Sequence, residues 1–364
     1  MVVEANYHSR DSVTYKYMHD FPISDVTLTY PELSRRMHAP GKGVVFAVYY
    51  SILAAFGVPA NIVTIVILSK GGCGLSKCIT RYLVFMTVSD LLTIITAVIL
   101  SQLRAIYFPV SFLSTTPACS VVIALSFASI DTSVWLTVAF TFDRFLAICC
   151  QQLKQRYCTE KTAAVVIGSI LVFGYLKNVP FYFEFEPIYI IDNVPWFCSL
   201  KDVIYTSVVW KVYEWLHRIF NPCLPFFLIL FLNVLTVRHI QAASGARRRL
   251  RAHSNGDKQS DPEMESRRKS IILLFAISGS FTLLWLTSVL NFLFVQITAN
   301  NYADGSNSND PRFIFQESGY MLQLLSSCTN TCIYAGIQTK FRQQLKDAVK
   351  YPFTLVVKWL KRWT

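Results

Sequence analysis

The stretch CSVVIALSFASIDTSVWLTVAFTFDRFLAICC, residues 119–150, decides the fold because it is a long apolar run with a charged pair near its end. A helix needs about 20 apolar residues to cross a bilayer, and this run is long enough to cross with some tilt. Asp143 and Arg144 stand near its carboxyl end. Such a pair is costly in an apolar helix unless it lies at the water boundary and serves a function. The stretch therefore predicts a membrane protein with a functional site at one membrane surface.

The composition of the whole chain agrees with a membrane protein. Its 364 residues are 53% hydrophobic and 15% charged, whereas about 25% of the residues of a soluble domain are charged. A formal net charge of +12 fits nucleic-acid binding or basic cytoplasmic loops, and the apolar runs favour the loops, without a nucleic-acid partner. The sequence has no nucleophile elbow, phosphate-binding loop or metal cluster, so we expect no enzymatic activity.

Seven apolar runs of near-spanning length follow an amino-terminal segment of mixed polarity, residues 1–43. We expect that segment to be an extracellular tail without regular structure. Because it lacks the apolar core of a signal peptide, we expect the first run to drive membrane insertion. The runs are approximately 44–69, 79–104, 119–150, 162–183, 208–239, 270–298 and 313–337. They predict an all-α bundle of seven transmembrane helices over residues 44–338.

Basic residues concentrate in the segments that would lie on one side of the membrane. Residues 238–269 contain nine Lys and Arg, and residues 340–362 contain seven. This bias predicts an extracellular amino terminus, a cytoplasmic carboxyl terminus and a mobile third cytoplasmic loop of about 241–269. Within residues 339–364, Phe341, Leu345 and Val349 recur every four residues among basic neighbours, which predicts a short amphipathic helix against the lipid of the inner leaflet.

From about residue 44 to residue 350 the chain resembles the rhodopsin-like G-protein-coupled receptors. The residues that carry the resemblance are Asn61, Asp90, Cys119, Asp143-Arg144-Phe145, Pro222, Phe281, Trp285 and Asn330-Thr331-Cys332-Ile333-Tyr334. Residues 48–69 and 126–149 are also similar to an orphan branch reported to sense tryptophan and phenylalanine. The resemblance implies a multi-pass plasma-membrane receptor for an extracellular small molecule or peptide, such as an amino acid or neuropeptide. It implies a heterotrimeric G protein, arrestin and a receptor kinase as partners.

The resemblance also implies roles for individual residues. It implies a disulfide between Cys119 and Cys198, and it implies that G-protein coupling and activation depend on Asp143, Arg144, Phe281, Trp285, Asn330 and Tyr334. The family often has an acid low on the sixth helix that restrains the arginine of the third. Here that position is Arg267, and its repulsion of Arg144 predicts raised signalling without ligand.

A lone acid, Asp90, lies in the middle of the second run, where an ionisable residue indicates a functional site. With Ser133 and Asn330 it resembles the sodium pocket of the family, and oxygen ligands of this kind suit a hard cation. Sodium would then be an allosteric ligand; no other cofactor is expected. The alternative is a protonated Asp90 within a hydrogen-bond network.

Three positions depart from the family pattern. Thr287 and Thr331 stand where the sixth and seventh helices usually have proline, and Leu230 replaces a frequent tyrosine in the fifth. Loss of the prolines removes the usual source of helix kinks. These departures motivate an alternative, a non-signalling or decoy receptor. A transporter is a further alternative, but the chain lacks the internal repeats of many transporters.

The ligand is the least determined feature of the sequence. Ser126 occupies the position at which amine receptors carry an aspartate, and Ser288 lacks the charge that the aromatic-amino-acid branch would place there. The remaining charges at comparable depth are Asp131, Glu214, Arg218 and Glu317. Glu214 and Arg218, four residues apart, would either bind ligand or pair with each other. We expect a small polar-aromatic or peptide ligand held partly by Arg218 and Asp131.

Overall fold

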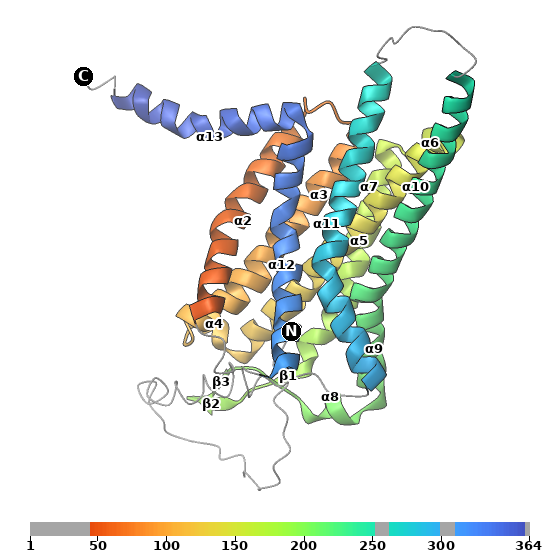
Figure 1. The fold of residues 1–364 in the computed structure, drawn as a ribbon. Helices are drawn as coiled ribbons and strands as arrows, with labels where there is room; N and C mark the ends of the chain where they lie inside the picture. The colour runs from red at the N-terminus through yellow and green to blue at the C-terminus, as the bar shows by residue number, and fades with distance from the viewer. Residues whose placement is uncertain (1–43, 252–261, 299–309, 361–364) are drawn as a thin grey trace.

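The structure is a computed structural model that describes the backbone of residues 44–251, 262–298 and 310–360. Side chains are described there except for residues 245–251, 262–267, 349 and 351–360. The helices form one elongated bundle (Figure 1). Its long helices are α2 (Val44–Lys70), α3 (Lys77–Thr93), α5 (Thr116–Cys149), α7 (Glu160–Lys177), α10 (Leu224–Arg251), α11 (Pro262–Thr298) and α12 (Pro311–Ile337). The predicted seven-helix membrane bundle is thereby confirmed.

Six helical spans within the described residues are long and apolar enough to cross a membrane. The seventh helix of the bundle, α12, is not among them, because it carries polar side chains that the bundle buries. Gln316, Glu317 and Asn330 are each less than 10% exposed. A membrane helix places such residues toward its neighbours rather than toward lipid.

The second and fifth spanning helices each contain a π-helical segment. The second continues from α3 through the π-helix η1 (Ile94–Leu103) into α4 (Arg104–Tyr107). The fifth consists of α9 (Val208–Arg218), the π-helical turn η4 (Ile219–Cys223) and α10, and Asn221 there has non-helical backbone angles. Pro222 follows at once, and proline lacks the amide hydrogen that a helix interior requires. By contrast, α11 and α12 run without interruption, as expected from Thr287 and Thr331.

The loop predicted at 241–269 is shorter than expected. Helix α10 extends to Arg251 and α11 begins at Pro262, which leaves residues 252–261 of that loop outside the described residues. The segment AASGARRRLR is rich in Ala and Arg, which are strong helix formers, and this propensity outweighs its one Gly and one Ser. The predicted tail, residues 1–43, also lies outside the described residues.

The two ends of the bundle differ (Figure 1). One end, called the strand end below, carries four short strands that pair antiparallel as β1 (Phe185–Glu186) with β4 (Ser199–Leu200) and β2 (Tyr189–Ile191) with β3 (Val194–Trp196). The opposite end carries α6 (Gln151–Tyr157) and α13 (Thr339–Leu360), which turns away from the bundle; we call this the α13 end. Helix α13 is anchored by the fully buried Phe341, whose ring packs edge-on against Tyr334 at 5.9 Å.

Candidate functional site

Asp143 and Arg144 lie near the last turn of α5, at the α13 end of the bundle, and both are buried. The Arg144 guanidinium donates from Nε to Asp143 Oδ2 over 3.0 Å and forms a second, shorter contact through Nη2. From α3, the Cys78 thiol donates to the other carboxylate oxygen, Asp143 Oδ1, over 3.3 Å. The carboxylate is thus shared between a neighbouring cation and a second helix, which holds the arginine close to its own helix.

A second thiol approaches this pair from the segment that follows α6. Cys158 Sγ donates to the backbone oxygen of Asp143 over 3.5 Å. Burial, followed by the nearby Asp143 carboxylate, raises the pKa of Cys158 to about 12. Cys158 therefore remains a neutral thiol at physiological pH and serves as a weak donor. The side chain of Arg267, predicted to repel Arg144, lies outside the described residues.

Asp90 is brought together with the two residues predicted to accompany it. Ser133 Oγ donates to Asp90 Oδ1 over 2.6 Å, and Asn330 Nδ2 donates to Asp90 Oδ2 over 2.7 Å. These three residues and Ser327 line one cavity between α3, α5, α11 and α12. The side chains that line this cavity thus include carboxylate, hydroxyl and amide groups, whose oxygens are the kind of ligand that suits a hard cation.

The same cavity is bounded by the aromatic pair of α11. The rings of Phe281 and Trp285 stack with centroids 5.1 Å apart, and both line the cavity that holds Asp90. Trp285 Nε1 donates to Ser326 Oγ of α12 over 3.2 Å. A shift of the Trp285 ring would therefore disturb both the α11–α12 contact and the polar cavity.

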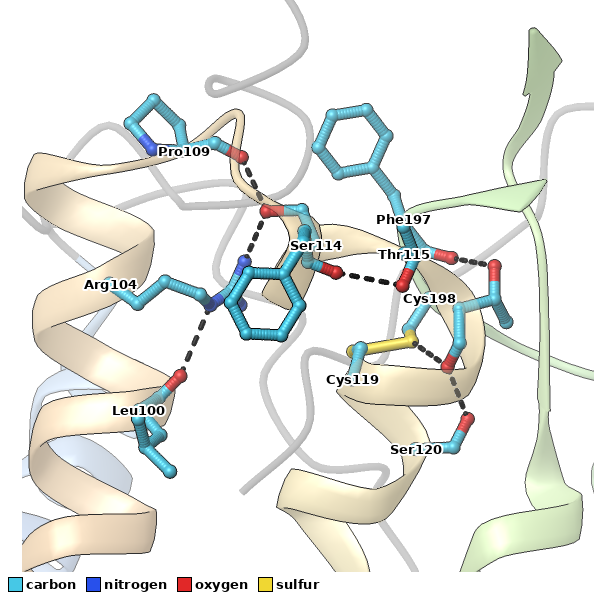
Figure 2. The surroundings of a disulfide bond; sticks show 11 residues. Leu100, Arg104, Pro109, Ser114, Thr115, Cys119, Ser120, Phe197 and Cys198 are labelled. Atoms are coloured by element: carbon cyan, nitrogen blue, oxygen red, sulfur yellow. Dashed lines mark hydrogen bonds between the residues drawn. A yellow bond between two sulfur atoms is a disulfide. The ribbon is translucent and has the colours of Figure 1, made fainter. Parts of the chain in front are cut away.

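At the strand end, Cys119 of α5 and Cys198 form a disulfide, the pairing implied by the family resemblance. Figure 2 shows Arg104 reaching the segment before α5, where its Nη1 donates to Ser114 Oγ over 2.8 Å. The backbone of Phe197 donates to Ser114 O over 2.7 Å. These contacts hold the loop after β3 against the start of α5, so the loop forms a tethered cover over this end of the bundle.

Asp131 lies inside the bundle, with a fully buried carboxylate. Lys177, at the end of α7, places Nζ 2.5 Å from Asp131 Oδ2. Asn178 Nδ2 donates to the same oxygen over 2.7 Å, and Asn221 Nδ2 donates to Oδ1. Asp131 therefore joins three helices through protein partners, and its predicted contact with a ligand stays a prediction.

The other predicted ligand residues do not form a single group. Glu214 and Arg218 pair along α9, with Arg218 Nε donating to Glu214 Oε2 over 3.2 Å, which matches the self-paired alternative. Ser126 donates to Val122 O over 2.7 Å within its own helix. Ser288 of α11 packs against Gly319 of α12, and Glu317 is buried on that same α12. Their roles in ligand binding remain predictions.

Sequence reasoning missed five polar residues that surround Asp131 and its helices: Lys177, Asn178, Glu184, His217 and Asn221. Four of these residues are less than 10% exposed, and the side chain of Lys177 is 14% exposed. A lone lysine at the end of an apolar run and an asparagine directly before Pro222 were the available signals. Nothing in the sequence linked either of them to Asp131. Within the described residues, no group of three or more His, Cys, Asp or Glu could hold a metal ion.

Comparison with known proteins identifies the kind of chain to which these clusters belong. The family described as 7 transmembrane receptor (rhodopsin family) matches residues 60–334. The chain is 26% identical over 317 residues to the mouse protein named Probable G-protein coupled receptor 142, covering 84% of this chain and 73% of that protein. It is 24% identical over 222 residues to the Drosophila melanogaster FMRFamide receptor, covering 57% of this chain and 39% of that receptor. The family match includes both the Asp90 cluster and the Asp143–Arg144 pair.

Proposed function

The chain belongs to the rhodopsin family of seven-transmembrane receptors, and from that premise we propose that it converts binding of an extracellular ligand into activation of a heterotrimeric G protein. The observation that carries this proposal is the buried Asp143–Arg144 pair at the α13 end of α5. Release of Arg144 from Asp143 would free a cation for the G protein. As a member of this family the protein is a multi-pass plasma-membrane signalling receptor and not an enzyme.

The proposed orientation places the strand end outside the cell and the α13 end in the cytoplasm. The basic residues of 238–269 and 340–362 support it, because Lys and Arg are enriched in cytoplasmic segments. The disulfide supports it as well, since disulfides persist in oxidising compartments. In this orientation α13 lies beside the inner leaflet, and the α13 end is also the surface for arrestin and a receptor kinase.

The proposed ligand is a small molecule or a peptide that enters from the strand end. The similarity to the mouse receptor 142 supports a place for this chain in the orphan branch that its sequence resembles. The name of the fly relative, FMRFamide receptor, refers to a peptide. The stacked pair Phe281–Trp285 would transmit its binding toward Asp90, because these side chains line one cavity. Sodium held by Asp90, Ser133, Ser327 and Asn330 would favour the inactive packing of that cavity.

Nucleotide exchange tests the proposed function. Membranes containing the receptor are mixed with purified G proteins of each class, and GTP-analogue binding is measured with and without Arg144→Ala. We expect exchange on at least one class, and we expect its loss in Arg144→Ala with normal surface expression. Arg156→Ala on the exposed helix α6 is the control, because it removes the same charge from the same end of the bundle.

A second candidate function, a receptor that binds ligand without signalling, is favoured by the uninterrupted helices α11 and α12. The usual proline kinks are absent, so the sixth helix lacks its ordinary hinge. Normal surface expression without exchange on any G-protein class, with or without agonist, would support this function and reject the first.

A further inference from the structure

The carboxylates between α5, α7 and α9 do not all have an ion-pair partner. Three carboxylates belong to this region, those of Asp131, Glu184 and Glu214, and two of them are paired with a cation. Lys177 pairs with Asp131, and Arg218 pairs with Glu214. Of these three carboxylates, Glu184 is the one that forms no salt bridge among the described residues, although Arg218 attracts it from α9.

Glu184 is held in place by its backbone, while one oxygen of its carboxyl group has no hydrogen-bond partner. It is the last residue of the helical turn η3 (Val179–Glu184), and its backbone oxygen accepts from Lys201 N over 2.9 Å. The residue is 2% exposed, and its Oε1 atom makes no hydrogen bond. The Lys201 ammonium donates to Phe183 O over 2.8 Å, and within the described residues it forms no salt bridge with Glu184.

Aromatic rings stand beside this carboxyl group. Phe181, on the same turn, stacks on Phe127 of α5 with centroids 4.3 Å apart and contacts Tyr213 of α9 at 5.4 Å. Tyr213, Glu214 and Arg218 of α9 are all close enough to Glu184 to interact with it electrostatically, and Arg218 attracts its negative charge. The turn that carries Glu184 therefore packs among aromatic rings at the strand end of the bundle, and the Tyr213 ring interacts with the Glu184 carboxyl group itself.

A buried carboxylate without a partner is costly, and a cation that reaches it removes that cost. Aromatic faces attract the same cations through their quadrupoles. We propose that Glu184 forms the anionic subsite for a ligand that carries an ammonium or guanidinium group beside an aromatic ring. This rests on the proposed receptor function, and it supplies from another helix the carboxylate that is missing at Ser126.

The subsite is tested by thermal melting of the purified full-length receptor, with benzylammonium as the probe and benzyl alcohol as its neutral counterpart. We expect benzylammonium at saturation to raise the melting temperature of the unmodified receptor by about 2–4 °C, and benzyl alcohol to leave it unchanged. The cation-specific rise should disappear in Glu184→Gln and persist in Glu186→Gln, a control two residues along in β1.

Two results would overturn the subsite. One is an absence of any cation-specific rise in the unmodified receptor, as expected if Glu184 carries a proton and binds nothing. The other is an equal rise in Glu184→Gln. Glu184→Met, which places an apolar side chain of similar length in the same position, replaces Glu184→Gln if that variant does not fold. The melting experiment requires no G protein, so a failure of the subsite can be distinguished from a failure of the proposed signalling function.

Discussion

The Lys177 ammonium lies 2.5 Å from the Asp131 carboxylate, inside the bundle and between α5 and α7. Asn178 and Asn221 complete the donors around the same carboxylate, so the ion pair also reaches the broken fifth helix. A buried pair of this kind contributes more to specifying helix positions than to net stability, because desolvation offsets much of the attraction. Loss of one partner is strongly destabilising, because it leaves the other charge buried and uncompensated.

We predict that Asp131→Asn and Lys177→Met each destabilise the receptor strongly, by about 3–5 kcal/mol, because each leaves the opposite charge buried alone. The double variant should recover much of that loss, since it leaves no unpaired charge. Thermal melting of purified receptor measures all three. If the double variant were as unstable as the sum of the two single variants, the two side chains would not interact.

Arg267→Glu is predicted to lower signalling without ligand. An acid at this position could pair with Arg144 across the α13 end, whereas the natural arginine is predicted to repel it. A restraint worth about 0.5–1 kcal/mol would reduce basal nucleotide exchange by about two- to fivefold. The control is Arg268→Glu, which makes the same change one residue along at an exposed position. Equal basal exchange in Arg267→Glu and the unmodified receptor would reject the predicted repulsion.

Gly319 and Gly336 lie on the same helix but in different surroundings, which gives a matched pair of substitutions. A Cβ at Gly319 would lie 3.0 Å from Ser288 Oγ and 3.2 Å from Ser288 N, whereas one at Gly336 would meet nothing within 4 Å. Gly336→Ala should stabilise the receptor by up to about 1 kcal/mol through helix propensity. Gly319→Ala should instead lower the melting temperature, because it forces α11 away from α12. We expect it to reduce the free energy of unfolding by about 1–3 kcal/mol. Equal melting temperatures would show that the two helices do not need this close approach.

The helices and the Asp90 cluster were predictable from the sequence because both depend on local or well-marked features. Apolar runs of spanning length identify the helices, and Asp90 and Asn330 occupy marked positions in two of them. The partner of Asp131 was not predictable, because Lys177 is 46 positions away and pairs with it only through helix packing. Glu184 was missed for a related reason. Its lack of a salt bridge is apparent only when the ion pairs of the neighbouring charges are known.

The prediction for the segment between the fifth and sixth helices differs from the structure for another reason. Residues 241–269 contain Ser, Gly and Asn, and the sequence therefore predicted an irregular loop. The structure extends α10 to Arg251 and starts α11 at Pro262, because the runs of Ala and Arg and the proline at the first helical position favour helix. The average composition of residues 241–269 concealed these local preferences for helix.

Sodium is predicted to stabilise the receptor through Asp90. NaCl should raise the melting temperature of purified receptor by about 2–5 °C over choline chloride at equal ionic strength, because choline is too large for a site formed by Ser133 and Asn330. Asp90→Asn should abolish the difference, since it removes the charge while keeping the size of the side chain. Asp192→Asn, in the β2–β3 turn, is the control and should retain the full effect. A protonated Asp90 would have no preference for sodium, and the melting temperatures in the two salts would then coincide in the unmodified receptor.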